Sequence, residues 1–155
     1  MTTHVFVTVG AQMAFDRLVH AVEAWYGREE RPGVEVFAQV GPTANPPTAL
    51  ASVASLGPDG FAARMAWADV VVSHAGMGTI ISALVDGVPL VVMPRRGTLM
   101  ETRNDHQVAT VAHFADRPGI TAVADEAELL AVLDDHAWST PDPIGNHASP
   151  SCSTW

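Results

Sequence analysis

The segment from Val70 to Pro94 constrains the fold more than any other part of this chain, because its pattern is strand, glycine turn, helix, turn and strand. Residues 70–72 are β-branched and apolar, which is typical of a strand buried on both faces. A helix is predicted over residues 79–85, and a second buried strand over residues 90–93. The segment therefore predicts a βαβ unit.

Glycines mark the two turns of this unit. Gly76 and Gly78 bracket the first turn, where backbone can approach a ligand closely, and Gly87 with Pro89 ends the helix. In a βαβ unit the helix N-terminus lies outside the carboxyl end of a strand. Open α/β sheets bind phosphorylated ligands at this place, so the turn is the first candidate for a site.

The same alternation continues along the rest of the chain. The patterns predict strands over residues 4–9, 34–39, 51–56 and 120–123, and helices over residues 15–25, 61–67, 105–114 and 126–133. Residues 57–60 are expected to form a turn before a helix, and Asp125 is expected to cap the last helix, with Glu128 at its third position. We therefore predict an α/β fold, a Rossmann-like parallel sheet with helices on both faces, over residues 1–136. Residues 137–155 are poor in apolar side chains and are expected to form a flexible tail.

Composition excludes several classes of function. The net charge of −9 argues against general nucleic-acid binding and against docking on anionic lipid. Cys152 is the only cysteine, which rules out a disulfide framework and a cysteine zinc site. No apolar run approaches the length of about 18 residues that a membrane-spanning helix needs. With no signal-peptide pattern, we expect a cytoplasmic protein that only a partner could recruit to a membrane.

Two common nucleotide motifs are missing. The first strand is followed by Gly10-Ala11-Gln12, which is not a Gly-x-Gly-x-x-Gly fingerprint, and no Gly-Lys-Ser/Thr occurs anywhere. Dinucleotide-dependent and P-loop chemistry thus lose their main support. Three of the eight basic residues, Arg95, Arg96 and Arg103, cluster beside the predicted site. These arginines either lie on the surface without a further role or create a local positive potential that faces an anionic ligand.

Four motifs in order carry a resemblance to a known family. The run His74-Ala-Gly-x-Gly-Thr79, then Gly87-Val-Pro89, then Glu101 and Asp105-His106-Gln107, resembles the donor-binding half of family 28 (MurG-like) glycosyltransferases. The opening motif from Val5 to Val19 is similar to the same group. The chain is most similar to the stand-alone form of that C-terminal domain. Such forms are the catalytic subunit of the dolichol-linked N-acetylglucosamine transferase and bacterial exopolysaccharide glycosyltransferase subunits.

The resemblance implies a donor site. It assigns substrate binding to Gly10, Gln12, His74, Gly76, Gly78, Thr79, Ser82, Glu101, Asp105 and Gln107. The helix N-terminus would hold the diphosphate, the first loop would face the transferred sugar, and the acids would accept hydrogen bonds from sugar hydroxyls. No Asp-x-Asp metal motif occurs, so no metal and no cofactor are expected. The catalytic residue stays unassigned, with His74 and Glu101 as candidates.

One position departs from the family pattern. Many relatives carry an acidic residue five positions before the glycine of Gly-Val-Pro, where it holds the ribose hydroxyls, and this chain has Ser82 there. A serine can make a hydrogen bond but cannot clamp a diol. Ribose recognition in the family's manner is therefore not implied for this chain.

Taken together, the resemblance implies a donor-binding subunit of a metal-independent hexosyltransferase of the GT-B class. The donor would be a UDP-sugar, and the acceptor a lipid-linked or polymer molecule held by a membrane-associated partner subunit. Two alternatives stay open: a non-catalytic nucleotide-sugar-binding or regulatory subunit, and a nucleotide-sugar 2-epimerase-like enzyme. The isolated chain could also self-associate. Trp25, Tyr26 and Trp67 are expected in the core or on the surface more often than as anchors of an interface.

Overall fold

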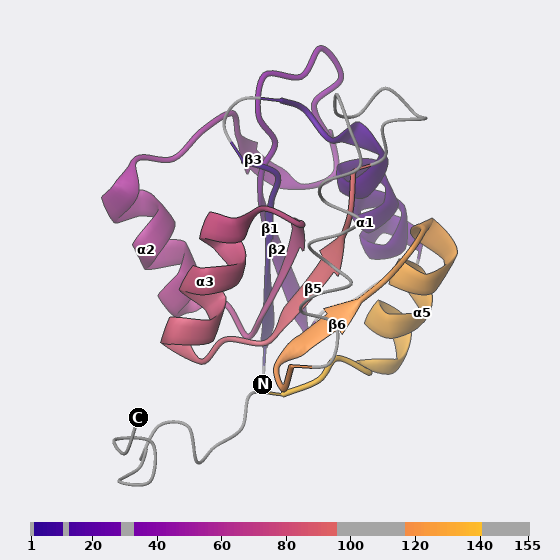
Figure 1. The fold of residues 1–155 in the computed structure, drawn as a ribbon. Helices are drawn as coiled ribbons and strands as arrows, with labels where there is room; N and C mark the ends of the chain where they lie inside the picture. Colours follow the sequence, from indigo (N-terminus) through magenta and orange to yellow (C-terminus); the bar gives the residue numbers. More distant parts are fainter. Residues whose placement is uncertain (1, 11–12, 29–32, 96–116, 141–155) are drawn as a thin grey trace, which may run out of the picture.

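The computed structural model describes residues 2–10, 13–28, 33–95 and 117–140, and in it a parallel sheet lies between two layers of helices (Figure 1). The strands follow the order β3-β2-β1-β4-β5-β6, and every neighbouring pair is parallel. Their bounds are β1 Thr3–Thr8, β2 Val34–Gln39, β3 Ala51–Val53, β4 Val70–His74, β5 Leu90–Met93 and β6 Ile120–Ala122. The helices described are α1 Asp16–Arg28, α2 Pro58–Trp67, α3 Met77–Asp86 and α5 Glu126–Asp135. The α/β class predicted from the sequence is confirmed.

Each strand serves both layers, because successive side chains point to opposite faces. On β1, Val5 and Val7 pack in the cluster beneath α1 and α5, whereas Phe6 packs in the cluster beneath α2 and α3. Figure 1 shows these two helix pairs on opposite sides of the sheet. Trp25 is 1% exposed within the first cluster, and Tyr26 and Trp67 are partly buried against the two clusters, as expected of core aromatics.

The helix ends follow from local chemistry. Gly87 ends α3 in the left-handed conformation, with φ of 70°, which an L side chain adopts only at a cost. The predicted cap of α5 is confirmed, since the Asp125 carboxylate accepts a hydrogen bond from the Glu128 N–H at 2.9 Å. Glu128 in turn accepts one from the Ala124 N–H at 3.2 Å.

Two helix starts predicted from the sequence are wrong. α2 begins at Pro58 rather than at residue 61, because proline has no N–H to lose and suits the first helical turn. α3 begins at Met77 rather than at residue 79, so Gly78 lies inside the helix and Gly76 alone forms the cap. The strand predicted over residues 51–56 also ends early, at Val53. The helix predicted over residues 105–114 lies outside the described residues.

Packing continues beyond residue 136, where we predicted the domain to end. Trp138 packs against the cluster beneath α1 and α5. The Ser139 N–H donates to the Thr121 hydroxyl at 2.6 Å, and the Ser139 hydroxyl accepts from the Gly119 N–H at 3.0 Å. The first residues of the expected tail are therefore tied to β6.

Candidate functional site

The candidate site lies at the carboxyl ends of β1 and β4. These strands pair directly, with Thr8 opposite Ser73, so the turns that follow them are neighbours. A Cβ placed on Gly10 would lie 3.3 Å from the His74 Nε2 atom, which brings the two turns into contact. Gly10 has φ of 81°, so glycine is favoured there by conformation as well as by space.

The N-terminus of α3 is open. Gly76 caps the helix and has no side chain to offer, so no side-chain hydrogen bond closes the first turn. The first helical bond runs from the Ile80 N–H to the Gly76 carbonyl at 3.1 Å. The N–H groups of Met77, Gly78 and Thr79 thus have no acceptor within the helix. Such groups, together with the helix dipole, form a ready binding site for an anion.

His74 stands beside this open end as a neutral base. Burial lowers its pKa to about 4, the Arg95 charge acts in the same direction, and the Thr8 backbone opposes them. Its Nδ1 atom is buried and has no hydrogen-bond partner within the described part of the chain. A buried nitrogen without a partner is costly, so this ring nitrogen calls for an explanation.

The imidazole of His74 lies directly against the backbone of Gly76. A Cβ on Gly76 would lie 2.9 Å from the His74 Cε1 atom and closer still to Nε2. Any larger residue would therefore displace the ring. The glycine thus serves two purposes: it leaves the helix end uncapped, and it lets His74 lie against the turn.

Arg95 has a structural position that sequence reasoning missed. It was expected either on the surface or facing the ligand, yet it is only 3% exposed. Its guanidinium donates to the carbonyls of Ala14, Val9 and Met13 at 2.5, 2.6 and 2.8 Å. No local sequence pattern predicts this contact, because the acceptors are backbone atoms more than 80 residues away.

A buried polar pair completes the edge of the sheet. The Thr8 hydroxyl donates to the Gln39 side-chain oxygen at 2.5 Å, and both residues are nearly fully buried, at the ends of β1 and β2. No sequence pattern singles out this pair.

The structure brings part of the predicted set together. Gly10 and Gly76 both lie beside the His74 ring, and Gly78 and Thr79 follow in the first turn of α3. The Thr79 side chain is 8% exposed and faces the core, so its N–H is the group available to a ligand. Ser82 is half-buried and lies one helical turn after Gly78, on the same face. Four predicted contacts and two arginines lie outside the described residues: Gln12, Glu101, Asp105, Gln107, Arg96 and Arg103.

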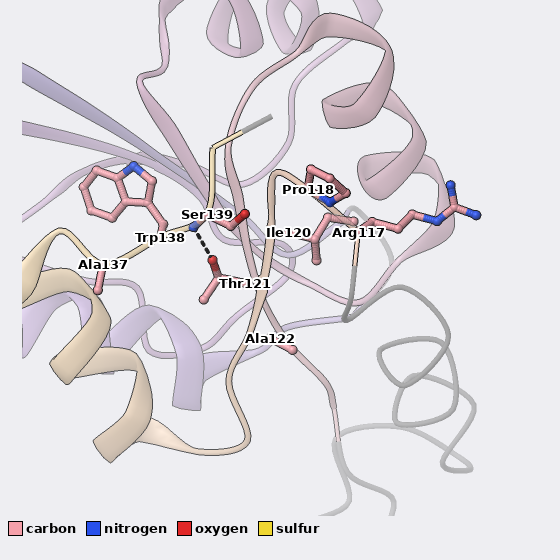
Figure 2. A pocket seen from close by; sticks show the side chains of 8 residues that line it. All are labelled: Arg117, Pro118, Ile120, Thr121, Ala122, Ala137, Trp138 and Ser139. Atoms are coloured by element: carbon pink, nitrogen blue, oxygen red, sulfur yellow. Dashed lines mark hydrogen bonds between the residues drawn. The ribbon is translucent and has the colours of Figure 1, made fainter. Parts of the chain in front are cut away.

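A groove lies elsewhere on the described part of the chain. It has a volume of about 620 Å³ and runs along β6, where Arg117, Thr121 and Trp138 help to line it. In Figure 2 the Trp138 ring and the Arg117 side chain lie at opposite ends of this groove, with the Ser139–Thr121 hydrogen bond between them. None of the residues that line this groove belongs to the turns at Gly10 and Gly76. The groove is therefore separate from the candidate site.

Within residues 2–10, 13–28, 33–95 and 117–140, no group of three or more His, Cys, Asp or Glu side chains could hold a metal ion. No helix in those same ranges has the length and apolar character needed to cross a membrane.

The sequence matches one family model. Residues 4–142 match the glycosyltransferase family 28 C-terminal domain, which includes every residue of the candidate site. No curated protein has a sequence that matches this chain significantly.

Solved structures share the fold at low sequence identity. MurG of Acinetobacter baumannii is 20% identical with a TM-score of 0.63, over 88% of this chain and 41% of that one. The solution structure of ALG13 is 19% identical with a TM-score of 0.63, over 93% of this chain and 90% of that one. The glycotransferase of kitacinnamycin is 18% identical with a TM-score of 0.59, over 87% of this chain and 34% of that one. The chain thus spans between about a third and two fifths of the two larger proteins, and nearly all of ALG13.

Proposed function

This chain belongs to the glycosyltransferase family 28 C-terminal domain family, and from that premise we propose that it is the donor-binding subunit of a metal-independent glycosyltransferase. The donor is a UDP-sugar, whose diphosphate binds at the N-terminus of α3. The acceptor is a lipid-linked or polymer molecule that a second, membrane-associated subunit holds.

The open N-terminus of α3 carries this proposal. Three N–H groups without helical acceptors stand beside the neutral His74, whose Nδ1 has no partner among the described residues. As the glycosidic bond breaks, negative charge develops on the departing diphosphate. Fixed N–H donors and a helix dipole stabilise that charge without a metal ion. A neutral imidazole adds a hydrogen-bond donor, because one of its two nitrogens carries the proton.

A partner is proposed because this chain matches only part of the two larger proteins. It covers 41% of the MurG chain but 90% of ALG13. An acceptor needs a surface opposite the donor, and a second polypeptide supplies it. Combining this chain with its acceptor-binding partner should produce sugar transfer that neither subunit gives alone.

The binding claim is tested by calorimetric titration with UDP, UDP-N-acetylglucosamine and UDP-glucose. Gly78→Pro removes one N–H from the first turn of α3, where proline is tolerated, and Gly78→Ala keeps that N–H. A Cβ at this position meets nothing within 4 Å, so the alanine variant is a matched control. We expect saturable UDP binding that Gly78→Ala keeps and Gly78→Pro weakens about tenfold. Equal affinity in both variants would remove the helix N-terminus from the site.

A binding role without turnover is the second candidate, and Ser82 favours it. This half-buried serine stands on α3 where many relatives have an acid that holds the ribose. If the assembled complex transfers sugar equally well with Gly78→Pro and Glu101→Gln, this chain regulates the complex rather than binding its reacting donor.

A further inference from the structure

Arg95 joins two parts of the site that lie far apart in the sequence. It follows β5, and its guanidinium reaches under the β1–α1 turn, where it donates to the carbonyls of Val9, Met13 and Ala14. The guanidinium also lies 5.0 Å from the centre of the Phe15 ring. All of these acceptors and the ring belong to one short segment between β1 and α1.

A buried arginine is an expensive way to satisfy carbonyls unless its charge or its shape is needed. Arginine stays protonated in proteins, so the charge persists at the 3% exposure of this side chain. Its planar fork can hold several acceptors at once, which a lysine ammonium on a flexible stem does less well. All three carbonyls of the β1–α1 turn accept hydrogen bonds from the one guanidinium, so the shape of this turn depends on the Arg95 side chain.

The turn is held from a second side by Gly41. This glycine has φ of 70°, and a Cβ on it would lie 3.1 Å from the Met13 carbonyl oxygen and 3.3 Å from that of Gly10. The β1–α1 turn is therefore packed between the backbone at Gly41 and the guanidinium of Arg95. Moving either support would move Gly10, where an added Cβ would lie only 3.3 Å from the His74 ring.

The positive charge of Arg95 also acts on the candidate site. Arg95 lowers the pKa of His74, so its field acts at the imidazole that faces the N-terminus of α3. The chain as a whole carries a net charge of −9, so a fixed local cation is valuable to a site for an anionic ligand.

We propose that Arg95 is a positioning residue: its guanidinium fixes the β1–α1 turn against His74, and its buried charge strengthens diphosphate binding through space, without touching the donor. The second half of this statement rests on the proposed function. The first half concerns only the turn and His74.

The test compares Arg95→Met, which removes charge and fork, with Arg95→Lys, which keeps only the charge. Arg64→Met is the matched control, because Arg64 lies over the Phe37 ring on the other face of the sheet. Three quantities are measured in each variant: the affinity for UDP, the pKa of His74 from its imidazole NMR signals, and amide exchange at Gly10. Unfolding curves show whether each variant is folded.

We expect Arg95→Met to weaken UDP binding about tenfold, to raise the pKa of His74 and to speed exchange at Gly10. Arg95→Lys should keep the low pKa of His74, speed exchange at Gly10 and weaken UDP binding less. Arg64→Met should change none of the three. If Arg95→Met does not fold, Arg95→Lys alone must show fast exchange with a low His74 pKa.

Some results would overturn the proposal. Unchanged exchange at Gly10 in a folded Arg95 variant would end the positioning role. Unchanged UDP affinity in folded Arg95→Met would end the electrostatic role. If the unaltered protein binds no UDP, the proposed function fails, while exchange and the His74 titration still decide the positioning role.

Discussion

Two strand-to-helix turns meet at the candidate site, and they are built in opposite ways. The β4–α3 turn is short: Ala75 and Gly76 separate the strand from the helix, and the helix starts at Met77. The β1–α1 turn is longer and depends on remote residues, since Arg95 holds its carbonyls and Gly41 packs against it. One turn is specified by its own sequence and the other by the rest of the fold.

The difference shows which residues determine the conformation of each turn. A local turn needs a residue of the right conformation at the right place, and glycine at the α3 cap meets that need. A remote support needs the β-sheet to form first, because β5 must bring Arg95 beneath the turn. The two turns should therefore respond differently to substitution, and four changes test this, from the largest expected effect to the smallest.

Gly76→Ala should have the largest effect. The added Cβ would overlap the His74 ring, and moving a buried ring should lower the free energy of unfolding by about 3 kcal/mol. Urea denaturation measures the loss. His74→Ala in the same chain should restore most of it, because the clash lies with that ring alone. Gly78→Ala is the control within the same turn, where a Cβ meets nothing within 4 Å. Equal losses in the two single variants would contradict this account of the turn.

His74 makes stability depend on pH. Its pKa is about 4 in the folded protein against 6.5 for an ordinary histidine, so the unfolded chain binds the proton more readily. Stability is therefore lost as pH falls from about 6.5 towards 4, and the loss between pH 7 and pH 5 should be about 2 kcal/mol.

The measurement is the difference between the unaltered protein and His74→Gln, which cannot titrate. Unfolding free energies are taken at several pH values for both proteins. The difference should change with pH between 7 and 5 and flatten below about 4. Parallel curves for the two proteins would mean that the ring is not held neutral.

Gly10→Ala tests the remotely supported turn. Its φ of 81° costs an L side chain about 1–2 kcal/mol, and the Cβ would also press on His74. Gly87→Ala is the matched control, because Gly87 has φ of 70° and no atom near a Cβ. Thermal unfolding should show Gly10→Ala as the more harmful change. A larger loss in Gly87→Ala would mean that contact across the site contributes nothing.

The sequence predicted the locally specified parts and missed the remote ones. The β2 and β5 strands were predicted with their observed bounds, because short apolar runs bounded by turn residues mark a buried strand. The open helix end at Gly76 was located for the same reason, although α3 starts two residues earlier than predicted. Arg95 was predicted as a surface or ligand-facing residue, because no sequence pattern pairs a side chain with carbonyls 81 to 86 residues away.

Asp125→Ala should have the smallest effect, and it extends the comparison to a third turn. The α5 helix closes its own N-terminus, since the Asp125 side chain accepts from Glu128, while α3 leaves that place open. Removing the cap should lower the free energy of unfolding by about 1 kcal/mol, by urea denaturation, and leave UDP affinity unchanged. Asp125→Asn, which keeps an acceptor, should lose less. The Asp125 carboxylate occupies one N–H donor and places a negative charge at the N-terminus of α5, which disfavours an anion there, so a change in UDP affinity on Asp125→Ala would contradict the distinction between the capped and the open helix end.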